Sequence, residues 1–163
     1  MDFRDIEIIV SEIDGVLTND SNYLDTMNNV LFKSYCMKDF DIINLLKPYY
    51  TIVFLVEDPS ISYGVMRTRN LPFYFIKNKT EKKLDLLYKI LQKYNTTPEH
   101  LLYIGSRVSD MECMRLAEFK VTANDAILPL KSMANYISPV GGGQGVISSV
   151  YDLFSINNSA LNS

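Results

Sequence analysis

Several residue types that often carry chemistry are scarce in this chain. Its 163 residues contain no tryptophan, one histidine and two cysteines. Two cysteines and one histidine give neither a disulfide framework nor a zinc-binding pattern. We therefore interpret Cys36 and Cys113 as packing residues of a protein from a reducing compartment. His100 lies in a predicted loop and has no neighbour in the sequence that would suggest acid–base catalysis.

Long apolar runs and an excess of basic residues are also absent. The strongly apolar segments, such as residues 51–56, are far shorter than the roughly 20 residues that span a bilayer. The charged amino terminus lacks the apolar stretch of a secretory signal. Sixteen Lys and Arg against nineteen Asp and Glu give a net charge of -3, so no basic field attracts a polyanion. We expect a cytoplasmic protein that binds neither nucleic acid nor membrane.

The composition is that of one folded domain. Hydrophobic residues make up 47% and charged residues 21% of the chain, a balance typical of globular proteins. The length matches the usual size of a single domain. We expect one domain over residues 1–155 and a frayed tail over residues 156–163.

Apolar strand-like runs alternate with amphipathic helical segments. Strands are expected over residues 6–10, 51–56, 71–76, 101–104 and 119–122, and helices over residues 42–46, 60–70, 84–94, 109–116 and 146–154. A projecting hairpin is expected at about 22–35, and Ser60 and Ser109 are expected to cap the helices that follow them. This alternation predicts an α/β three-layer sandwich with a mostly parallel sheet. Ligands of such sheets bind beyond the carboxyl ends of the strands.

Two carboxylates follow the first predicted strand. Glu12 and Asp14 are two residues apart and are expected to project to the same side, and Gly15 lets the chain turn closely beneath them. Such a pair can hold a hard cation, or divide into a nucleophile and a proton donor. Solvated polar residues at a strand end give the same pattern, so the pair alone is weak evidence.

The segment Ser11-Glu12-Ile13-Asp14-Gly15-Val16-Leu17-Thr18-Asn19 resembles the Asp-x-Asp-Gly-Val-Leu-Thr-Asp motif of haloacid dehalogenase (HAD) superfamily phosphatases. Three further segments, at residues 31–39, 103–110 and 142–146, are similar to the 3-deoxy-D-manno-octulosonate 8-phosphate phosphatase subfamily. The resemblance covers about residues 5–154. It implies a Rossmann-like, HAD-like fold with a small hairpin after the first strand and no large cap domain.

The resemblance also extends to the C-terminal domain of animal acylneuraminate cytidylyltransferases, the CMP-sialic acid synthetases. Their Asn-Glu-Val-Ser-Asp-type segment is similar to Ser106-Arg107-Val108-Ser109-Asp110. That domain shares the fold, so the resemblance implies that this fold can serve assembly or regulation as well as catalysis.

The family's functional positions can be carried over to matching residues of this chain. The catalytic positions correspond to Glu12, Asp14 and Lys83. The magnesium positions correspond to Glu12, Asp14 and Asp110. The positions that contact a sugar-acid phosphate correspond to Lys33, Asp39, Gly142 and Gly143. Lys83 can equally be a solvated helix lysine, and Asp110 can instead complement the dipole of the helix that it opens.

The chain departs from the family's pattern at three of its motifs. Glu12 replaces the nucleophilic aspartate, which moves the attacking oxygen by roughly an ångström. Val56-Glu57-Asp58 replaces a phosphate-binding hydroxyl followed by Gly-Arg, so a phosphate would meet repulsion there. Ser106 and Arg107 replace the two aspartates of Gly-Asp-Asp, which predicts weak magnesium binding.

These features leave three functional hypotheses. The first is a non-catalytic domain that forms a homotetramer through its hairpin, as the resemblance implies, and acts in assembly or regulation within sialic acid or keto-sugar-acid metabolism. The second is a magnesium-dependent phosphatase that hydrolyses a 2-keto-3-deoxy sugar-acid phosphate. The third is a protein that binds a small molecule without turnover, in the cleft that corresponds to the phosphatases' active site. The glycine loop at residues 141–145 would cover part of that ligand.

Overall fold

The structure is a computed structural model that describes residues 5–77 and 82–157. Its elements follow one another in the order β1 (Ile8–Glu12), β2 (Tyr23–Leu24), β3 (Val30–Phe32), α1 (Met37–Leu46), β4 (Thr51–Val56), α2 (Ile61–Thr68), β5 (Phe73–Phe75), α3 (Lys83–Lys93), η2 (Pro98–His100), β6 (Leu101–Ile104), η3 (Val108–Asp110), α4 (Met111–Leu116), β7 (Phe119–Thr122), α5 (Leu128–Met133), β8 (Tyr136–Ile137) and α6 (Val146–Asn157). None of the helices in this part of the chain is long and apolar enough to cross a membrane.

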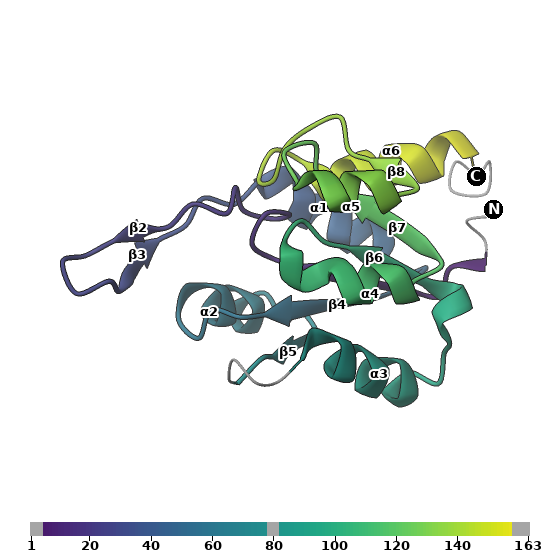
Figure 1. Cartoon of the computed structure of the whole chain (residues 1–163), viewed down its shortest axis with the longest axis horizontal. Helices are drawn as coiled ribbons and strands as arrows, with labels where there is room; N and C mark the ends of the chain where they lie inside the picture. Colours follow the sequence, from purple (N-terminus) through teal and green to yellow (C-terminus); the bar gives the residue numbers. More distant parts are fainter. Residues whose placement is uncertain (1–4, 78–81, 158–163) are drawn as a thin grey trace.

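A twisted sheet forms the centre of the molecule (Figure 1). Its strand order is β5-β4-β1-β6-β7-β8, and every pairing between these strands is parallel. Strand β1 lies between β4 and β6, so both of its edges are hydrogen-bonded. The mostly parallel sheet predicted from the sequence is therefore confirmed.

Helices cover both faces of the sheet, which confirms the predicted three-layer sandwich. Side chains of α1, α2 and α6 share one hydrophobic cluster with one face of the sheet. Those of α3, α4 and α5 share a second cluster with the other face. Within β4, Phe54 belongs to the first cluster while Val53 and Leu55 belong to the second. Burial on both faces explains why this strand is a continuous apolar run and does not alternate with polar residues.

The hairpin of β2 and β3 projects from the body, as Figure 1 shows. Its turn is local: the Asp25 carboxylate accepts hydrogen bonds from the backbone N–H groups of Met27 and Asn29, and Asn28 adopts a positive φ of 64°. Asparagine tolerates this left-handed conformation better than most residues. The predicted hairpin after the first strand is thus confirmed.

Some predicted boundaries were wrong. The first strand does not end at Val10 but includes Ser11 and Glu12, because its parallel pairing with β4 continues to Leu55. The sequence also gave no strong signal for the short α5 and β8. The predicted frayed tail lies mostly outside the described residues, at 158–163, and α6 continues to Asn157.

Cys113 and Cys36 differ in their surroundings. Cys113 is fully buried in the second hydrophobic cluster, and burial raises the pKa of its thiol to about 12. A thiol in such surroundings stays protonated and inert, so Cys113 is a packing residue as predicted. Cys36 is a free, half-buried cysteine immediately before α1.

Candidate functional site

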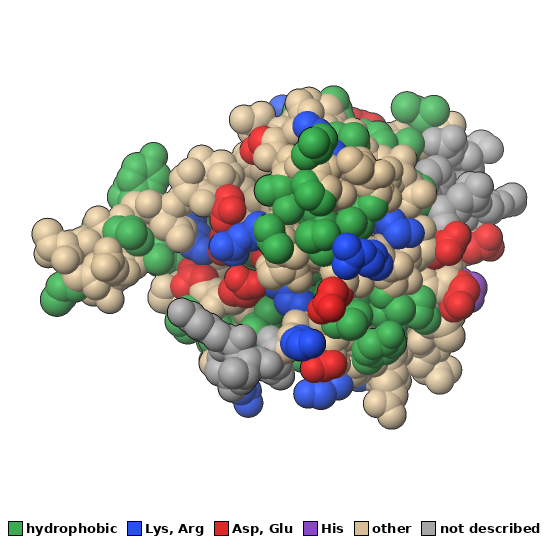
Figure 2. All heavy atoms as spheres, viewed as in Figure 1, with side chains coloured by type: hydrophobic (Ala, Val, Ile, Leu, Met, Phe, Trp, Pro, Cys, Tyr) green, Lys and Arg blue, Asp and Glu red, His purple; other side chains and the backbone are tan. Residues whose placement is uncertain are grey.

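Charged side chains gather at the carboxyl end of the sheet, where β1, β4 and β6 lead into loops. Figure 2 shows acidic and basic side chains crowded where the hairpin leaves the body. The lysine that opens α3 reaches the same place, because its ammonium contacts residues from all three strand ends. The topology therefore brings together the carboxyl ends of β1, β4 and β6 and the start of α3.

Lys83 binds three carboxylates at once. Its Nζ lies 2.6 Å from Glu12 Oε1, 2.9 Å from Asp110 Oδ1 and 2.8 Å from Glu57 Oε1. The Glu12 and Asp110 side chains are 2% and 0% exposed, whereas that of Glu57 is 33% exposed. Lys83 itself is buried, so the interpretation of it as a solvated helix lysine was wrong. We call these four residues the Lys83 cluster.

Burial controls the protonation of the Lys83 cluster. Burial raises the pKa of Glu12 well above its ordinary value, and the neighbouring Asp110 carboxylate raises it further. Burial alone would lower the pKa of Lys83, but the negative charges of its partners outweigh that effect and raise it. Lys83 therefore stays positively charged, and its charge offsets part of the rise in the pKa of Glu12.

Asp110 is held by hydrogen bonds on both of its oxygens. Its Oδ1 also accepts a bond from the Tyr103 hydroxyl at 2.8 Å. Its Oδ2 accepts bonds from the backbone N–H groups of Ser106 at 3.0 Å and Arg107 at 2.9 Å. Asp110 thus caps the turn at η3 and also contacts the lysine. The predicted cap, Ser109, lies inside η3 and does not cap α4.

A second lysine joins the hairpin to the sheet. Lys33, directly after β3, donates to both oxygens of Asp14 at 2.9 Å and lies 3.1 Å from Asp58 Oδ2. It also donates to Ser62 Oγ at 3.3 Å, and Thr18 Oγ1 donates to Asp14 Oδ1 at 3.0 Å. We call Lys33, Asp14 and Asp58 the Lys33 cluster. Asp14 and Glu12 therefore pair with different lysines, although they are only two residues apart.

Asp58 begins the loop into α2 and replaces the cap that the sequence suggested. Its carboxylate accepts bonds from the backbone N–H groups of Ser60 and Ser62, whereas Ser60 makes no side-chain capping bond. Burial alone would raise the pKa of Asp58, but these hydrogen bonds and Lys33 lower it to about 2. The aspartate thus outcompetes the serine as a cap because it carries a charge that the N–H groups and Lys33 stabilise.

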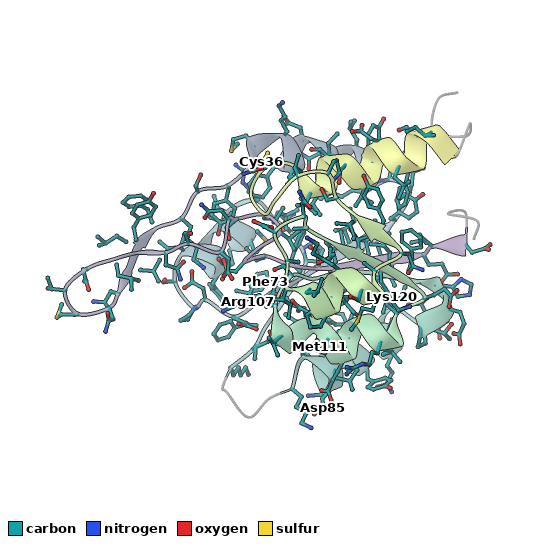
Figure 3. The ribbon with its side chains drawn as sticks, turned by 45° about the horizontal axis from the view of Figure 1, so that its top comes forward. Cys36, Phe73, Asp85, Arg107, Met111 and Lys120 are labelled. Carbon is teal, nitrogen blue, oxygen red and sulfur yellow. The ribbon has the colours of Figure 1, made fainter. Side chains whose placement is uncertain are left out.

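Arg107 lies in the loop after β6 and contacts acids from three other segments. Figure 3 labels it at the end of the body from which the hairpin projects. Its Nη1 lies 3.1 Å from Glu57 Oε2 and 3.9 Å from Glu12 Oε1, and its Nε lies 3.5 Å from Asp20 Oδ2. A cavity of about 610 Å³ opens beside it. The residues lining this cavity are Gly15, Asn19, Asp20, Glu57, Ser106, Arg107, Val108, Ser109, Asp125, Ala126 and Ile127.

Gly142 and Gly143 pack against the loop that follows β1. A Cβ at Gly142 would lie 2.5 Å from the carbonyl oxygen of Gly15, and one at Gly143 would lie 2.8 Å from the backbone nitrogen of Asn19. Gly143 also has a positive φ of 71°. Only glycine fits such close backbone contact. These glycines therefore have a packing role whether or not they contact a ligand.

Asp39, the remaining residue expected to bind substrate, caps the last helix. It is fully buried, and its Oδ1 accepts hydrogen bonds from the backbone N–H of Ser148 at 2.8 Å and from the Ser148 hydroxyl at 2.9 Å. Asp39 does not line the cavity beside Arg107. Its observed contacts fix α6 against α1.

The carboxylates of the cleft do not fit a magnesium ion. Magnesium demands several oxygen ligands in near-octahedral geometry. Both oxygens of Asp14 face Lys33, both oxygens of Asp110 are hydrogen-bonded, and only Glu12 Oε2 is buried without a donor. Throughout residues 5–77 and 82–157, no group of three or more His, Cys, Asp or Glu side chains is arranged to hold a metal. Three cations of the chain itself, Lys33, Lys83 and Arg107, contact these acids.

Sequence reasoning missed Tyr103 and Asp20 as contributors to this site. Tyr103 lies in an apolar strand and is fully buried, so its sequence context signals only packing. Asp20 follows a turn-prone asparagine, and it too has a positive φ, of 60°. Neither carries a local pattern that would reveal its partner.

Comparisons with known proteins agree with this architecture. No family model matches the chain. The 3-deoxy-D-manno-octulosonate 8-phosphate phosphatase KdsC of Salmonella typhi is 23% identical over 158 residues, which cover 97% of this chain and 84% of that protein.

Two solved structures show the same fold with bound metal. The cobalt-bound deoxy-D-mannose-octulosonate 8-phosphate phosphatase (YrbI) of Haemophilus influenzae superposes with a TM-score of 0.85 at 20% identity, covering 95% of this chain and 90% of that one. The 3-deoxy-D-manno-octulosonate 8-phosphate phosphatase of Moraxella catarrhalis, in complex with magnesium, phosphate and KDO, gives a TM-score of 0.84 at 17% identity, covering 98% and 91%.

A parallel sheet between two helical layers, with acidic residues at its central strand ends and a lysine opening the helix behind them, defines a protein of the HAD-like Rossmann class. The predicted fold class is confirmed. The chain shares the fold of haloacid dehalogenase hydrolases and is similar in sequence, over nearly its whole length, to 3-deoxy-D-manno-octulosonate 8-phosphate phosphatases. Its similarity to acylneuraminate cytidylyltransferases stays a prediction.

Proposed function

We propose that this chain keeps the scaffold of the sugar-acid phosphate phosphatases but does not transfer phosphoryl groups. It acts in assembly or regulation within the metabolism of sialic acids or related keto-sugar acids. The observation that carries this proposal is the Lys83 cluster, in which one ammonium lies within 2.9 Å of three carboxylates. An active nucleophile would need a free, charged oxygen aimed at phosphorus.

The contacts of Glu12 support the loss of nucleophilic catalysis. Its Oε1 is bound to Lys83 at 2.6 Å, and burial together with Asp110 raises its pKa. Glu57 adds a negative charge at the mouth of the same cleft, where it would repel an incoming phosphate. Lys83, Lys33 and Arg107 contact the acids of the cleft, and the described residues show no arrangement of free oxygens of the kind that a metal needs.

The surface of the hairpin supports a role in assembly. Five of its large hydrophobic side chains are between 50% and 77% exposed: Tyr23, Leu24, Met27, Leu31 and Phe32. Tyr23 and Phe32 stack on one another with ring centroids 4.3 Å apart. Exposed apolar side chains that gather on one projection are typical of an interaction surface. A homotetramer formed through this hairpin would bury them.

Hydrolysis of a panel of small phosphate esters tests the absence of catalysis. The wild-type chain and the Asp14→Asn variant, each assayed with magnesium, are expected to show the same background rate. A magnesium-dependent rate that the wild type has and Asp14→Asn lacks would establish the alternative function, a magnesium-dependent phosphatase acting on a 2-keto-3-deoxy sugar-acid phosphate. That alternative is favoured by the phosphatases among its relatives.

Light scattering tests the proposed assembly. We expect a solution mass near four times the 18.7 kDa of one chain. The double variant Tyr23→Ser, Phe32→Ser should shift the mass towards that of a single chain. Tyr88→Ser removes an exposed tyrosine from α3 and serves as the control, whose mass should not change. A wild-type mass of one chain would contradict assembly through the hairpin.

A further inference from the structure

Glu57 bridges two cations that come from different parts of the chain. It follows β4 directly, and its two carboxylate oxygens have different partners. Oε1 lies 2.8 Å from Lys83 Nζ at the start of α3, and Oε2 lies 3.1 Å from Arg107 Nη1 in the loop after β6. A carboxylate that spreads its oxygens over a lysine and an arginine occupies the kind of site that also binds a phosphate or sulfate group.

Glu57 differs from the other carboxylates that bind Lys83. Glu12 and Asp110 are almost completely buried, whereas the Glu57 side chain is 33% exposed. It also lines the cavity of about 610 Å³ beside Arg107, together with Gly15 and Ser106. Glu57 can therefore leave its partners for solvent without breaking the core, and the space that it would vacate is continuous with a cavity large enough for a ligand.

We propose that Lys83 and Arg107 form a binding site for an oxyanion and that the carboxylate of Glu57 occupies this site in the free protein. A tetrahedral oxyanion, either inorganic phosphate or the phosphate group of a small molecule, binds between these two cations only when the Glu57 carboxylate is displaced or neutralised. This inference deepens the proposed function, because it identifies what fills the cleft of a chain that does not turn over a phosphate ester.

The remaining charges around the site set the size of the expected effect. Glu12 and Asp110 still face Lys83 after Glu57 is neutralised, and Asp20 still lies 3.5 Å from Arg107. The site therefore gains one unit of positive charge and the hydrogen-bond donors that Glu57 had used. Because Glu57→Gln removes the carboxylate that competes with phosphate for Lys83 and Arg107, we expect phosphate affinity to rise at least about tenfold.

Calorimetric titration with inorganic phosphate at constant ionic strength tests the proposal. The Glu57→Gln variant is expected to bind phosphate at least about tenfold more tightly than the wild type, and the double variant Glu57→Gln, Arg107→Gln should lose that gain. Glu99→Gln is the matched control: it removes one exposed carboxylate at the opposite end of β6, and its phosphate affinity should equal that of the wild type.

Thermal melting confirms that each variant is folded, and Glu57→Ala provides a second test if Glu57→Gln is destabilised. Equal phosphate affinity in the wild type and in a folded Glu57→Gln or Glu57→Ala variant would overturn the proposal, as would a gain that survives the loss of Arg107. The outcome is separable from the proposed function, because ester hydrolysis by the wild type would refute the absence of catalysis while leaving the phosphate titration of Glu57→Gln unaffected.

Discussion

Two lysines neutralise acids at the same edge of the sheet, but their clusters are built differently. In the Lys83 cluster, the side chains of Glu12 and Asp110 are 2% and 0% exposed, and that of Glu57, at the rim, is 33% exposed. Lys33 binds Asp14 and Asp58, whose side chains are 13% and 9% exposed. The Lys83 cluster joins a helix to the central strands, whereas the Lys33 cluster joins the base of the hairpin to the loops around it.

The two clusters therefore have different structural roles. Carboxylates without access to water depend for their charge compensation on their lysine and on the other donors that the protein supplies. Carboxylates that reach solvent can exchange part of that compensation for hydration. We infer that the Lys83 cluster maintains the fold, while the Lys33 cluster fixes the position of the hairpin and, through it, the proposed assembly.

The largest effect is expected from Lys83→Met. This change leaves two buried carboxylates without their shared cation, and breaking a buried ion pair in this way costs about 3–5 kcal/mol of unfolding free energy. Urea unfolding measures the loss. Lys82→Met, which changes the exposed lysine one residue earlier, should cost less than about 1 kcal/mol. Equal stabilities of the two variants would show that the Lys83 cluster does not stabilise the fold.

A smaller effect is expected from Lys33→Met. Its carboxylate partners reach water, so the expected loss of unfolding free energy is about 1–3 kcal/mol. The same urea series measures it, with Lys38→Met, an exposed lysine of α1, as the control. A loss as large as that of Lys83→Met would remove the distinction between the two clusters.

The smallest effect depends on pH and concerns Asp58. Its pKa is about 2 in the fold against an ordinary value of 3.8, so its contribution is present above about pH 4 and is lost as the pH falls towards 2. Allowing for partial exposure, this contribution is about 1–2 kcal/mol. Between pH 5 and pH 3 the urea midpoint of Asp58→Asn should therefore fall less than that of the wild type. Asp41→Asn, exposed on α1, should follow the wild type, and parallel curves for all three proteins would refute the assignment.

The sequence allowed the layers of the fold to be predicted because apolar periodicity reports burial. The continuous run of β4 and the amphipathic face of α3 are examples. The extension of β1 through Ser11 and Glu12 could not be predicted, since polar residues ordinarily mark a strand's end and only pairing with β4 keeps them in the sheet. The short α5 and β8 contain too few residues to show a hydrophobic periodicity in the sequence.

The candidate site was predictable in its location but not in its pairings. Strand ends and the motif-like segments placed Glu12, Asp14, Lys83 and Asp110 at one edge of the sheet. Which carboxylate meets which cation depends on loops that are distant in sequence, such as the contact of Arg107 with Glu57. Such contacts leave no periodic signal, and only the folded geometry reveals that the acids are already in contact with cations of the chain.

The central claim is that cations of the chain itself replace a metal in this cleft. Calorimetric titration of the folded wild-type chain with magnesium chloride tests it most directly. We predict no saturable binding of magnesium up to millimolar concentration. Stoichiometric binding with a dissociation constant well below a millimolar, lost in Asp14→Asn, would contradict the account.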